Sequence, residues 1–455
     1  MKKTLASIIA ILFIYVNQVS ADVQDEKAKT ALAEYVEKPD SSYNYKIRRI
    51  TKRSDGVSYA EIVMTSQTWH EPWKHQLLII IPSTIRQDAT HALMLVSGGR
   101  WNKSFEDSDY VSKKLESNLW LYINLANKVG TPIAVVSQIP YQPMWGMKED
   151  ALIAHTFSKY LETGDTNWPL LLPMVKSAVR AMDTIQDFTK KQWSLDIKTF
   201  TVTGASKRGW TTWLTGAVDK RVTAIAPMVI DILNMGKQME RQQEVLGKGN
   251  FSEKIGEYTQ RGIQLQTETP IGKSLLSIVD PYSYRENITQ PKVIILGTND
   301  RYWTLDALNY YWKELVGQKY ILYVPNRGHK LSEYMKIMGT INAIHQNAAF
   351  GTVLPNLTWH SNTVKGRLSY TLKSDMEPYA VRAWFAESPI KDFRDAEWNT
   401  SNLKLRKGKY NFKIKTPADK CVAVFIEAEY EANMNYFFTT NIRIIGPKTC
   451  NPVSD

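Results

Sequence analysis

Cysteine and histidine are scarce in this 455-residue chain. It contains two cysteines, Cys421 and Cys450, and seven histidines that fall in no spacing typical of metal ligands. Two cysteines are too few for a cysteine-based structural zinc site, and we expect no metal and no other cofactor. In an exported chain the two cysteines can form a disulfide that closes a loop of about 29 residues and stabilises the fold by roughly 3–4 kcal/mol. We predict this disulfide, with two buried thiols as the alternative.

Long apolar runs are also missing, apart from one at the N-terminus. Residues 1–21 begin with Lys2 and Lys3, continue with an apolar stretch at 4–16 and end with the small-residue site Val19-Ser20-Ala21. This is the pattern of a cleaved signal peptide, so we expect export to the periplasm or the cell exterior. We expect no integral membrane segment in the mature chain.

Clusters of one charge sign are short and few, although the formal net charge is +12. Lys and Arg are scattered, and the densest groups, Lys46–Arg49 and Lys404–Lys407, are not repeated. Because no recognised nucleic-acid-binding module accompanies them, we expect no nucleic-acid partner. The remaining composition, with 43% hydrophobic and 22% charged residues, is that of an ordinary globular protein.

The chain does contain a long alternation of short apolar runs with helical patterns. Several of the runs are continuously apolar, as buried strands are. The alternation predicts an α/β fold with a mostly parallel sheet and helices on both of its faces. The strands are expected at 57–69, 74–82, 91–99, 131–140, 197–204, 222–230, 291–300 and 320–326. The helices are expected at 109–130, 169–192, 304–316 and 330–350.

The stretch TVTGASKRGW, residues 201–210, lies where an expected strand meets an expected helix. It nearly matches the nucleophile elbow G-x-S-x-G, in which small residues beside the serine allow a sharp, strained turn. A glycine and an alanine precede Ser206, but Arg208 stands in the place of the second glycine and Gly209 follows it. Ser206 is a candidate nucleophile, and a helix N-cap is the alternative for the motif taken alone.

The chain order of an acid and a histidine supports Ser206 as a nucleophile. Asp300 ends one expected strand, and His329 follows the next one. Nucleophile, acid and histidine occur in this order in α/β-hydrolases. The histidine would take the serine proton and return it to the leaving group, while the carboxylate would fix the tautomer of the histidine. Asp306 is the rival for the acid, and Asp231 is a weaker one.

A developing oxyanion needs two backbone N–H donors. We expect one from Lys207, the residue after the nucleophile, and the other from Gly98 or Gly99 in the loop after an earlier strand. A tight turn is the alternative role of the two glycines. Arg100, Lys207 and Arg208 can add positive charge near the cleft, and Arg100 and Arg208 are candidates for contact with the substrate. The alternative for Lys207 and Arg208 is that they pair with acids or face solvent.

Aromatic and polar residues past two other strand ends are candidates for a substrate pocket. Open α/β sheets bind ligands beyond the carboxyl ends of their strands. We expect Trp101, Tyr141, Gln142 and Trp145 to contact the substrate, with core packing as the alternative.

The change of pattern along the chain predicts three parts. Residues 1–21 form the signal peptide, and residues 22–351 form an α/β-hydrolase-like domain. Within this domain the polar, helix-prone stretch 232–288 interrupts the alternation, at a place where hydrolases often carry a lid. Residues 352–455 consist of short alternating strands between turn signals, which indicates a C-terminal β-sandwich of immunoglobulin-like type.

Four longer stretches are specific as a set. They are MTSQTWHEPWKHQL at 64–77, the segment from EDALIAH to TIQDF at 149–188, the segment from TGASKRGW to DILNM at 203–235, and YVPNRGHKL at 323–331. As a set they resemble the PhoPQ-activated pathogenicity-related family. The resemblance implies an exported α/β-hydrolase-like domain with a C-terminal β-domain, and it places Ser206 and His329 at the motif serine and histidine. The acid segment GTNDRYWTLD departs from the family pattern, which leaves both Asp300 and Asp306 open.

The G-x-S-[KR]-x-G form of the elbow is also similar to that of glucuronoyl esterases. In those enzymes an arginine near the oxyanion site follows the serine, where this chain has Lys207. This similarity points to an ester of an acidic sugar.

We therefore predict an exported serine hydrolase that forms an acyl-enzyme. Its substrate would be an ester, or an amide, of a small molecule, a glycan or a peptide. The alternative is a non-catalytic secreted signalling or adhesion protein that retains the hydrolase fold, and a carbohydrate-binding protein is a third interpretation. The oligomeric state is left open.

Overall fold

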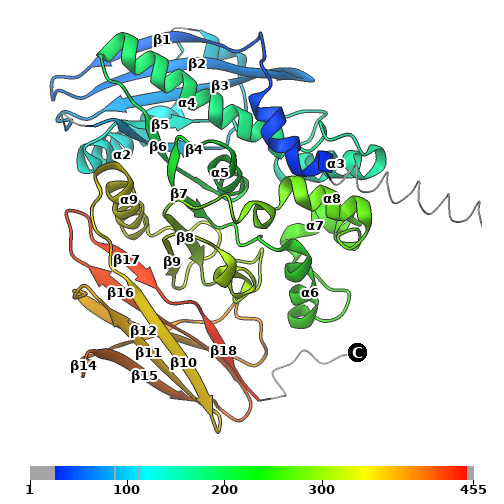
Figure 1. Cartoon of the computed structure of the whole chain (residues 1–455), viewed down its shortest axis with the longest axis vertical. Coiled ribbons are helices and arrows are strands. Elements are labelled where there is room, and N and C mark those ends of the chain that lie inside the picture. The colour runs from blue at the N-terminus through cyan, green and yellow to red at the C-terminus, as the bar shows by residue number, and fades with distance from the viewer. Residues whose placement is uncertain (1–25, 87–88, 108, 111–112, 448–455) are drawn as a thin grey trace, which may run out of the picture.

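The computed structural model describes residues 26–86, 89–107, 109–110 and 113–447 (Figure 1). The predicted signal peptide and Cys450 lie outside the described residues, so the signal peptide and the disulfide stay predictions. A nine-stranded sheet forms the centre of the larger part of the chain, and two smaller antiparallel sheets follow it. Among the described residues, no helix combines the length and the apolar character needed to span a bilayer.

The large sheet is antiparallel at one edge and parallel over the rest. Its spatial order is β1-β2-β3-β5-β4-β6-β7-β8-β9, so β4 and β5 have exchanged places relative to the chain. Pairing is antiparallel from β1 through β2 and β3 to β5, and parallel from β5 to β9. This order identifies the α/β-hydrolase fold, with β1 as an additional edge strand. The bounds are β1 Asn44–Lys52, β2 Ser58–Trp69, β3 Glu71–Ile81, β4 His91–Val96, β5 Ile133–Val136, β6 Thr199–Ala205, β7 Val222–Met228, β8 Lys292–Gly297 and β9 Lys319–Val324.

Helices cover both faces of this sheet, which confirms the predicted α/β class (Figure 1). Two of them, α4 (Leu171–Trp193) and α5 (Lys207–Val218), pack into the core on one face. Two others, α2 (Lys113–Val129) and α9 (Tyr334–Phe350), pack into the core on the other face.

Neighbouring side chains of one strand enter opposite cores, because successive residues of a strand point to opposite faces. On β3, Ile79 belongs to the core under α4 and α5, and Ile80 to the core under α2 and α9. Burial on both faces explains why the strand sequences are continuously apolar and not alternating.

The predicted insertion at 232–288 supplies three helices between β7 and β8. They are α6 (Met235–Leu246), α7 (Gly256–Thr259) and α8 (Pro270–Val279). α7 and α8 pack against α3 (Glu149–Thr163), at the right of Figure 1.

The C-terminal strands form two antiparallel sheets that pack face to face. One has the order β10-β11-β15-β14, and the other has the order β13-β12-β16-β17 with β18 also paired to β16. Phe385 of β12 stacks on Phe412 of β15 across the two sheets, with ring centroids 5.6 Å apart. The bounds are β10 Leu357–Val364, β11 Arg367–Ser374, β12 Ala380–Ser388, β13 Asn399–Asn402, β14 Leu405–Arg406, β15 Lys409–Lys415, β16 Cys421–Tyr430, β17 Tyr436–Thr439 and β18 Arg443–Ile445.

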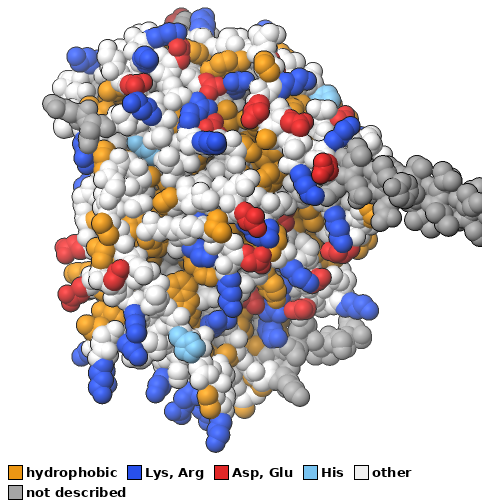
Figure 2. Space-filling model, viewed as in Figure 1, with side chains coloured by type: hydrophobic (Ala, Val, Ile, Leu, Met, Phe, Trp, Pro, Cys, Tyr) orange, Lys and Arg blue, Asp and Glu red, His pale blue; other side chains and the backbone are white. Residues whose placement is uncertain are grey.

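The C-terminal sheets lie against β9, the last strand of the large sheet (Figure 1). Tyr320 of β9 stacks on Phe438 of β17 with centroids 4.0 Å apart, and the N–H of Tyr323 donates to Oγ1 of Thr439 at 3.2 Å. An otherwise open sheet edge is thereby covered. On the face shown in Figure 2, Lys and Arg are interspersed with Asp and Glu and gather at the lower end, which the C-terminal sheets form.

Candidate active site

Ser206 lies at a sharp turn between the end of β6 and the start of α5. Its backbone has φ 59° and ψ −127°, a conformation that side-chain-bearing residues rarely adopt. Two hydrogen bonds hold the turn: Ser206 N–H donates to the Met228 carbonyl at 2.8 Å, and Trp210 N–H donates to the Ser206 carbonyl at 3.0 Å. A serine held in this way presents its hydroxyl beyond the carboxyl edge of the sheet.

Two glycines make this turn possible. A Cβ at Gly204 would lie 2.6 Å from the carbonyl oxygen of Arg208, and a Cβ at Gly209 would lie 2.8 Å from the carbonyl oxygen of Met228. Both distances are shorter than a carbon and an oxygen tolerate. The close approach of α5 to β7 therefore requires glycine at position 209, one residue later than in the G-x-S-x-G pattern.

Ser206, His329 and Asp300 form one hydrogen-bonded chain. Oγ of Ser206 lies 2.9 Å from Nε2 of His329, and Nδ1 of His329 lies 2.8 Å from Oδ2 of Asp300. Since the carboxylate accepts, Nδ1 carries the proton and Nε2 is free to accept from the serine hydroxyl. This is the arrangement that a serine nucleophile and its general base require.

The two other acids considered from the sequence are engaged elsewhere. Asp306 pairs with Arg241, with Oδ2 2.8 Å from Nη2. Asp231 is buried and accepts a hydrogen bond of 2.6 Å from the Tyr311 hydroxyl. Burial raises the pKa of Asp231 to about 7, against the lowering effect of the Tyr311 bond.

The loops that carry Asp300 and His329 are tied to the C-terminal part of the chain. The Asn299 side chain donates to the carbonyl of Ala396 at 2.8 Å. The Asn326 amide accepts from the Trp398 N–H at 2.7 Å and donates to the Trp398 carbonyl at 2.9 Å. The acid and the histidine are thus positioned partly by the segment that connects two C-terminal strands, β12 and β13.

Arg208 is buried and paired, and its guanidinium lies against the loop after β4. Its Nη1 and Nη2 each lie 2.7 Å from a carboxylate oxygen of Glu149, and its Nε donates to the carbonyl of Ile139. The guanidinium also lies against Gly98, where a Cβ would be 2.3 Å from Nη2. Although burial acts in the opposite direction, the hydrogen bonds from Arg208 lower the pKa of Glu149 to about 2.

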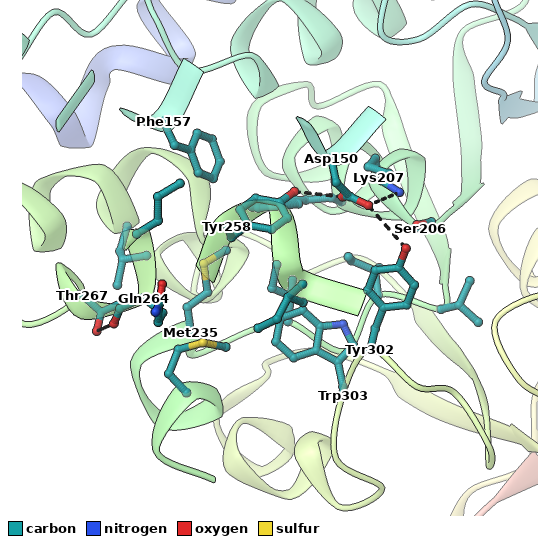
Figure 3. Close-up of a pocket in the computed structure, with 18 of the residues that line it drawn as sticks. Asp150, Phe157, Ser206, Lys207, Met235, Tyr258, Gln264, Thr267, Tyr302 and Trp303 are labelled. Carbon is teal, nitrogen blue, oxygen red and sulfur yellow. Dashed lines mark hydrogen bonds and ion pairs between the residues drawn. The ribbon is translucent and has the colours of Figure 1, made fainter. Parts of the chain in front are cut away.

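Lys207 is also buried and paired. Its Nζ lies 2.7 Å from Oδ2 of Asp150, whose carboxylate also accepts from the hydroxyls of Tyr258 at 3.0 Å and Tyr302 at 3.4 Å. Figure 3 shows Asp150 facing these three side chains. The Tyr302 ring lies against the His329 imidazole with centroids 4.3 Å apart, so this network borders the histidine directly.

The predicted oxyanion residues lie in the expected elements. Lys207 is the first residue of α5, where backbone N–H groups have no partner within the helix. Gly98 and Gly99 follow β4, and Gly99 has φ +136°, which favours glycine. Gln142 Nε2 donates to the Gly99 carbonyl at 3.0 Å, which fixes the orientation of this loop.

The predicted substrate contacts at Arg100, Trp101, Tyr141, Gln142 and Trp145 fall outside the set of residues that line the cavity at Ser206. Gln142 is buried and also bonds Glu149, and the Trp101 N–H donates to its carbonyl at 3.1 Å. Trp145 is 48% exposed. Arg100 lies in a separate hollow beside Gly98 and Gly99.

A cavity of about 90 Å³ opens at Ser206, and the sequence interpretation missed most of its wall (Figure 3). Asp150, Tyr258 and Tyr302 border it, although no local motif marks them. The one available signal was the position of Tyr302, two residues after Asp300 at the same strand end. Among the described residues, no group of three or more His, Cys, Asp or Glu side chains is placed to hold a metal ion.

Comparisons with known proteins agree with the resemblance drawn from the sequence. The family of PhoPQ-activated pathogenicity-related proteins matches residues 32–394. Autocrine proliferation repressor protein A of Dictyostelium discoideum is 29% identical, over 88% of this chain and 86% of its own length.

Among solved structures, an acetyl xylan esterase from Paenibacillus sp. R4 matches with 13% identity and a TM-score of 0.44, over 67% of this chain and 88% of its own. A glucuronoyl esterase from Solibacter usitatus matches with 13% identity and a TM-score of 0.40, over 70% and 91%. The strand order identifies the fold without them. The family match over most of the chain shows that this protein belongs to the PhoPQ-activated pathogenicity-related family.

Proposed function

We propose that the protein is a serine hydrolase that cleaves an ester through an acyl-enzyme. One observation carries this proposal: the hydrogen-bonded chain from Ser206 through His329 to Asp300, with distances of 2.9 and 2.8 Å. At one end of this series of hydrogen bonds, a strained turn presents Ser206 to a cavity, as a nucleophile requires.

The reaction follows from the roles of these groups. Oγ of Ser206 attacks the ester carbonyl while Nε2 of His329 takes its proton, and Asp300 stabilises the imidazolium. The oxyanion is held by the N–H of Lys207 and by an N–H of the Gly98–Gly99 loop. Collapse of the tetrahedral intermediate expels the alcohol, which receives the proton from His329. Water then attacks the acyl-enzyme with His329 again as base, and the free acid and Ser206 are regenerated.

A fluorophosphonate probe tests this proposal, because it labels only an activated serine. We expect the wild type to be labelled and Ser206→Ala to be unlabelled, with equal circular dichroism. Ser283→Ala removes an exposed hydroxyl from the insertion and serves as the matched control, with labelling unchanged. Equal labelling of Ser206→Ala and the wild type would refute the proposal, and no labelling of either would favour the non-catalytic alternative.

We also propose that residues 1–21 direct export and are removed. The supporting pattern is the basic start, the apolar stretch and the small residues that end at Ala21. Intact-mass measurement on protein from the periplasm or the medium should give a chain that begins at Asp22. A mature chain that retains Met1 and stays in the cytoplasm would contradict this.

A further inference from the structure

The cavity at Ser206 has an apolar wall built mainly by the predicted insertion. Met235 and Met239 of α6, Ile263, and Leu275 and Leu276 of α8 contribute to it. The rest of the wall includes Val229 and Ile230, which directly follow β7, and rings of the α/β part such as Trp210 and Trp303. Figure 3 shows the side chains of Phe157, Met235 and Trp303 around this space. Such a wall favours an apolar ligand group.

The charged side chains in the wall neutralise each other. Among the described residues that line the cavity, Asp150 and Lys207 are the ones that carry full charges, and they pair at 2.7 Å. Two tyrosine hydroxyls further occupy the Asp150 carboxylate. The Lys207 ammonium that could have met an acidic substrate is therefore already engaged, and the Lys207 side chain is only 11% exposed.

Resting on the proposed function, we infer that the substrate is a neutral ester whose acyl group is a short apolar chain bound in this cavity. One water molecule needs about 10–15 Å³ of such space, so a cavity of about 90 Å³ accommodates several groups of the size of a methylene. Butanoyl to hexanoyl chains, which differ only in the number of methylenes beyond the carbonyl carbon, fit this space. A substrate carboxylate in this cavity would lie beside Asp150 without a free cation. Both its desolvation and its repulsion by Asp150 would make binding less favourable.

The first experiment measures kcat/KM of the wild type on p-nitrophenyl acetate, butanoate, hexanoate and dodecanoate. Each methylene that enters the cavity should raise kcat/KM about fourfold, so butanoate should exceed acetate about 15-fold, and dodecanoate should fall below hexanoate. A parallel series of ethyl, butyl and hexyl acetates should vary little. Acetate as the best acyl group, or a chain-length optimum only in the alcohol series, would overturn the inference.

The second experiment compares two esters that differ only at the chain end. p-Nitrophenyl hexanoate should exceed the p-nitrophenyl monoester of adipate by about 100-fold, because the latter carries a terminal carboxylate. Asp150→Asn leaves Lys207 without its nearest partner and should reduce this preference at least tenfold. Glu162→Gln is the matched control, since Glu162 pairs with Lys159 on the surface of the same helix, and it should leave the preference unchanged.

The outcomes separate the two proposals. Fluorophosphonate labelling of Ser206 together with a preference for the adipate monoester would overturn the neutral-substrate inference and leave the serine hydrolase in place. An unchanged preference in folded Asp150→Asn would overturn the role of the Lys207–Asp150 pair. If Asp150→Asn fails to fold, the preference of the wild type between the two esters decides.

Discussion

The ion pair between Arg208 and Glu149 connects the turn at Ser206 to the start of α3, and its removal should have a measurable cost. Arg208→Met keeps much of the apolar stem but leaves the Glu149 carboxylate without its two bonds of 2.7 Å. Glu149→Gln removes the charge on the other side. The double variant then separates the interaction between the two side chains from the effect of each substitution.

The magnitude follows from the pKa of Glu149. Its fall from 4.5 to about 2 would correspond to about 3 kcal/mol if all of it reached the unfolding free energy. The Glu149 side chain is 38% exposed, so solvent screening reduces this figure to about 2 kcal/mol. Because the pKa is lowered on folding, this contribution is present above pH 4.5 and is lost as the pH falls toward 2.

The assay is urea unfolding of the wild type, both single variants and the double variant at pH 7 and at pH 3. We expect a coupling free energy of about 2 kcal/mol at pH 7 and a smaller one at pH 3. Arg208→Lys should recover less than half of it, since a lysine cannot form both bonds. A coupling below about 0.5 kcal/mol at pH 7 would mean that the pair contributes no more than an exposed one and would refute the reasoning.

Three further substitutions, two of them paired with a comparison variant, test other parts of the site. Gly209→Ala should lower the unfolding free energy by about 1–3 kcal/mol, measured by urea unfolding, whereas Gly256→Ala, whose Cβ would have room, should not. Asp300→Asn should lower kcat on p-nitrophenyl butanoate by about 10³–10⁴-fold, while Asp306→Asn should change kcat less than threefold. A large loss of kcat in Asp306→Asn and a small one in Asp300→Asn would instead assign the role of the acid to Asp306. Asp231→Asn should be more stable than the wild type by roughly 2–4 kcal/mol above pH 7 and equal to it near pH 4. The reason is that the pKa of Asp231 is raised on folding, so its contribution to the stability of the wild type is lost as the pH rises through about 7. Parallel curves of unfolding free energy from pH 4 to 9 for the two proteins would contradict this.

The fold and the position of Ser206 were predictable because their signals are local. Strands buried on both faces leave apolar runs in the sequence, and the elbow leaves its small residues within a few positions of the serine. His329 could be found because it follows the strand that the fold requires, with no other histidine in that segment. These features depend on backbone geometry and burial, which short stretches of sequence record.

The partners of the charged residues were not predictable in the same way. Lys207 could as well have faced solvent, and its pairing with Asp150 depends on where α3 lies relative to α5. Asp300 and Asp306 both follow β8, so only the three-dimensional course of the loop shows which of them reaches His329. Much of the wall of the cavity comes from an insertion whose sequence is polar overall, and the apolar side chains of this insertion show no periodicity that points toward Ser206.

The hydrogen bonds between the loops that carry Asp300 and His329 and the segment at 394–398 also affect when the site forms during folding. The bond from Asn299 to Ala396 spans 97 positions, and the one from Asn326 to Trp398 spans 72. Contacts of such separation close late in folding, because the intervening chain must first be ordered. A chain that is synthesised from its N-terminus therefore carries its serine turn well before its acid and histidine loops are fixed. We expect esterase activity to appear only after the last hundred or so residues have folded, so a truncated chain can be compact and still inert.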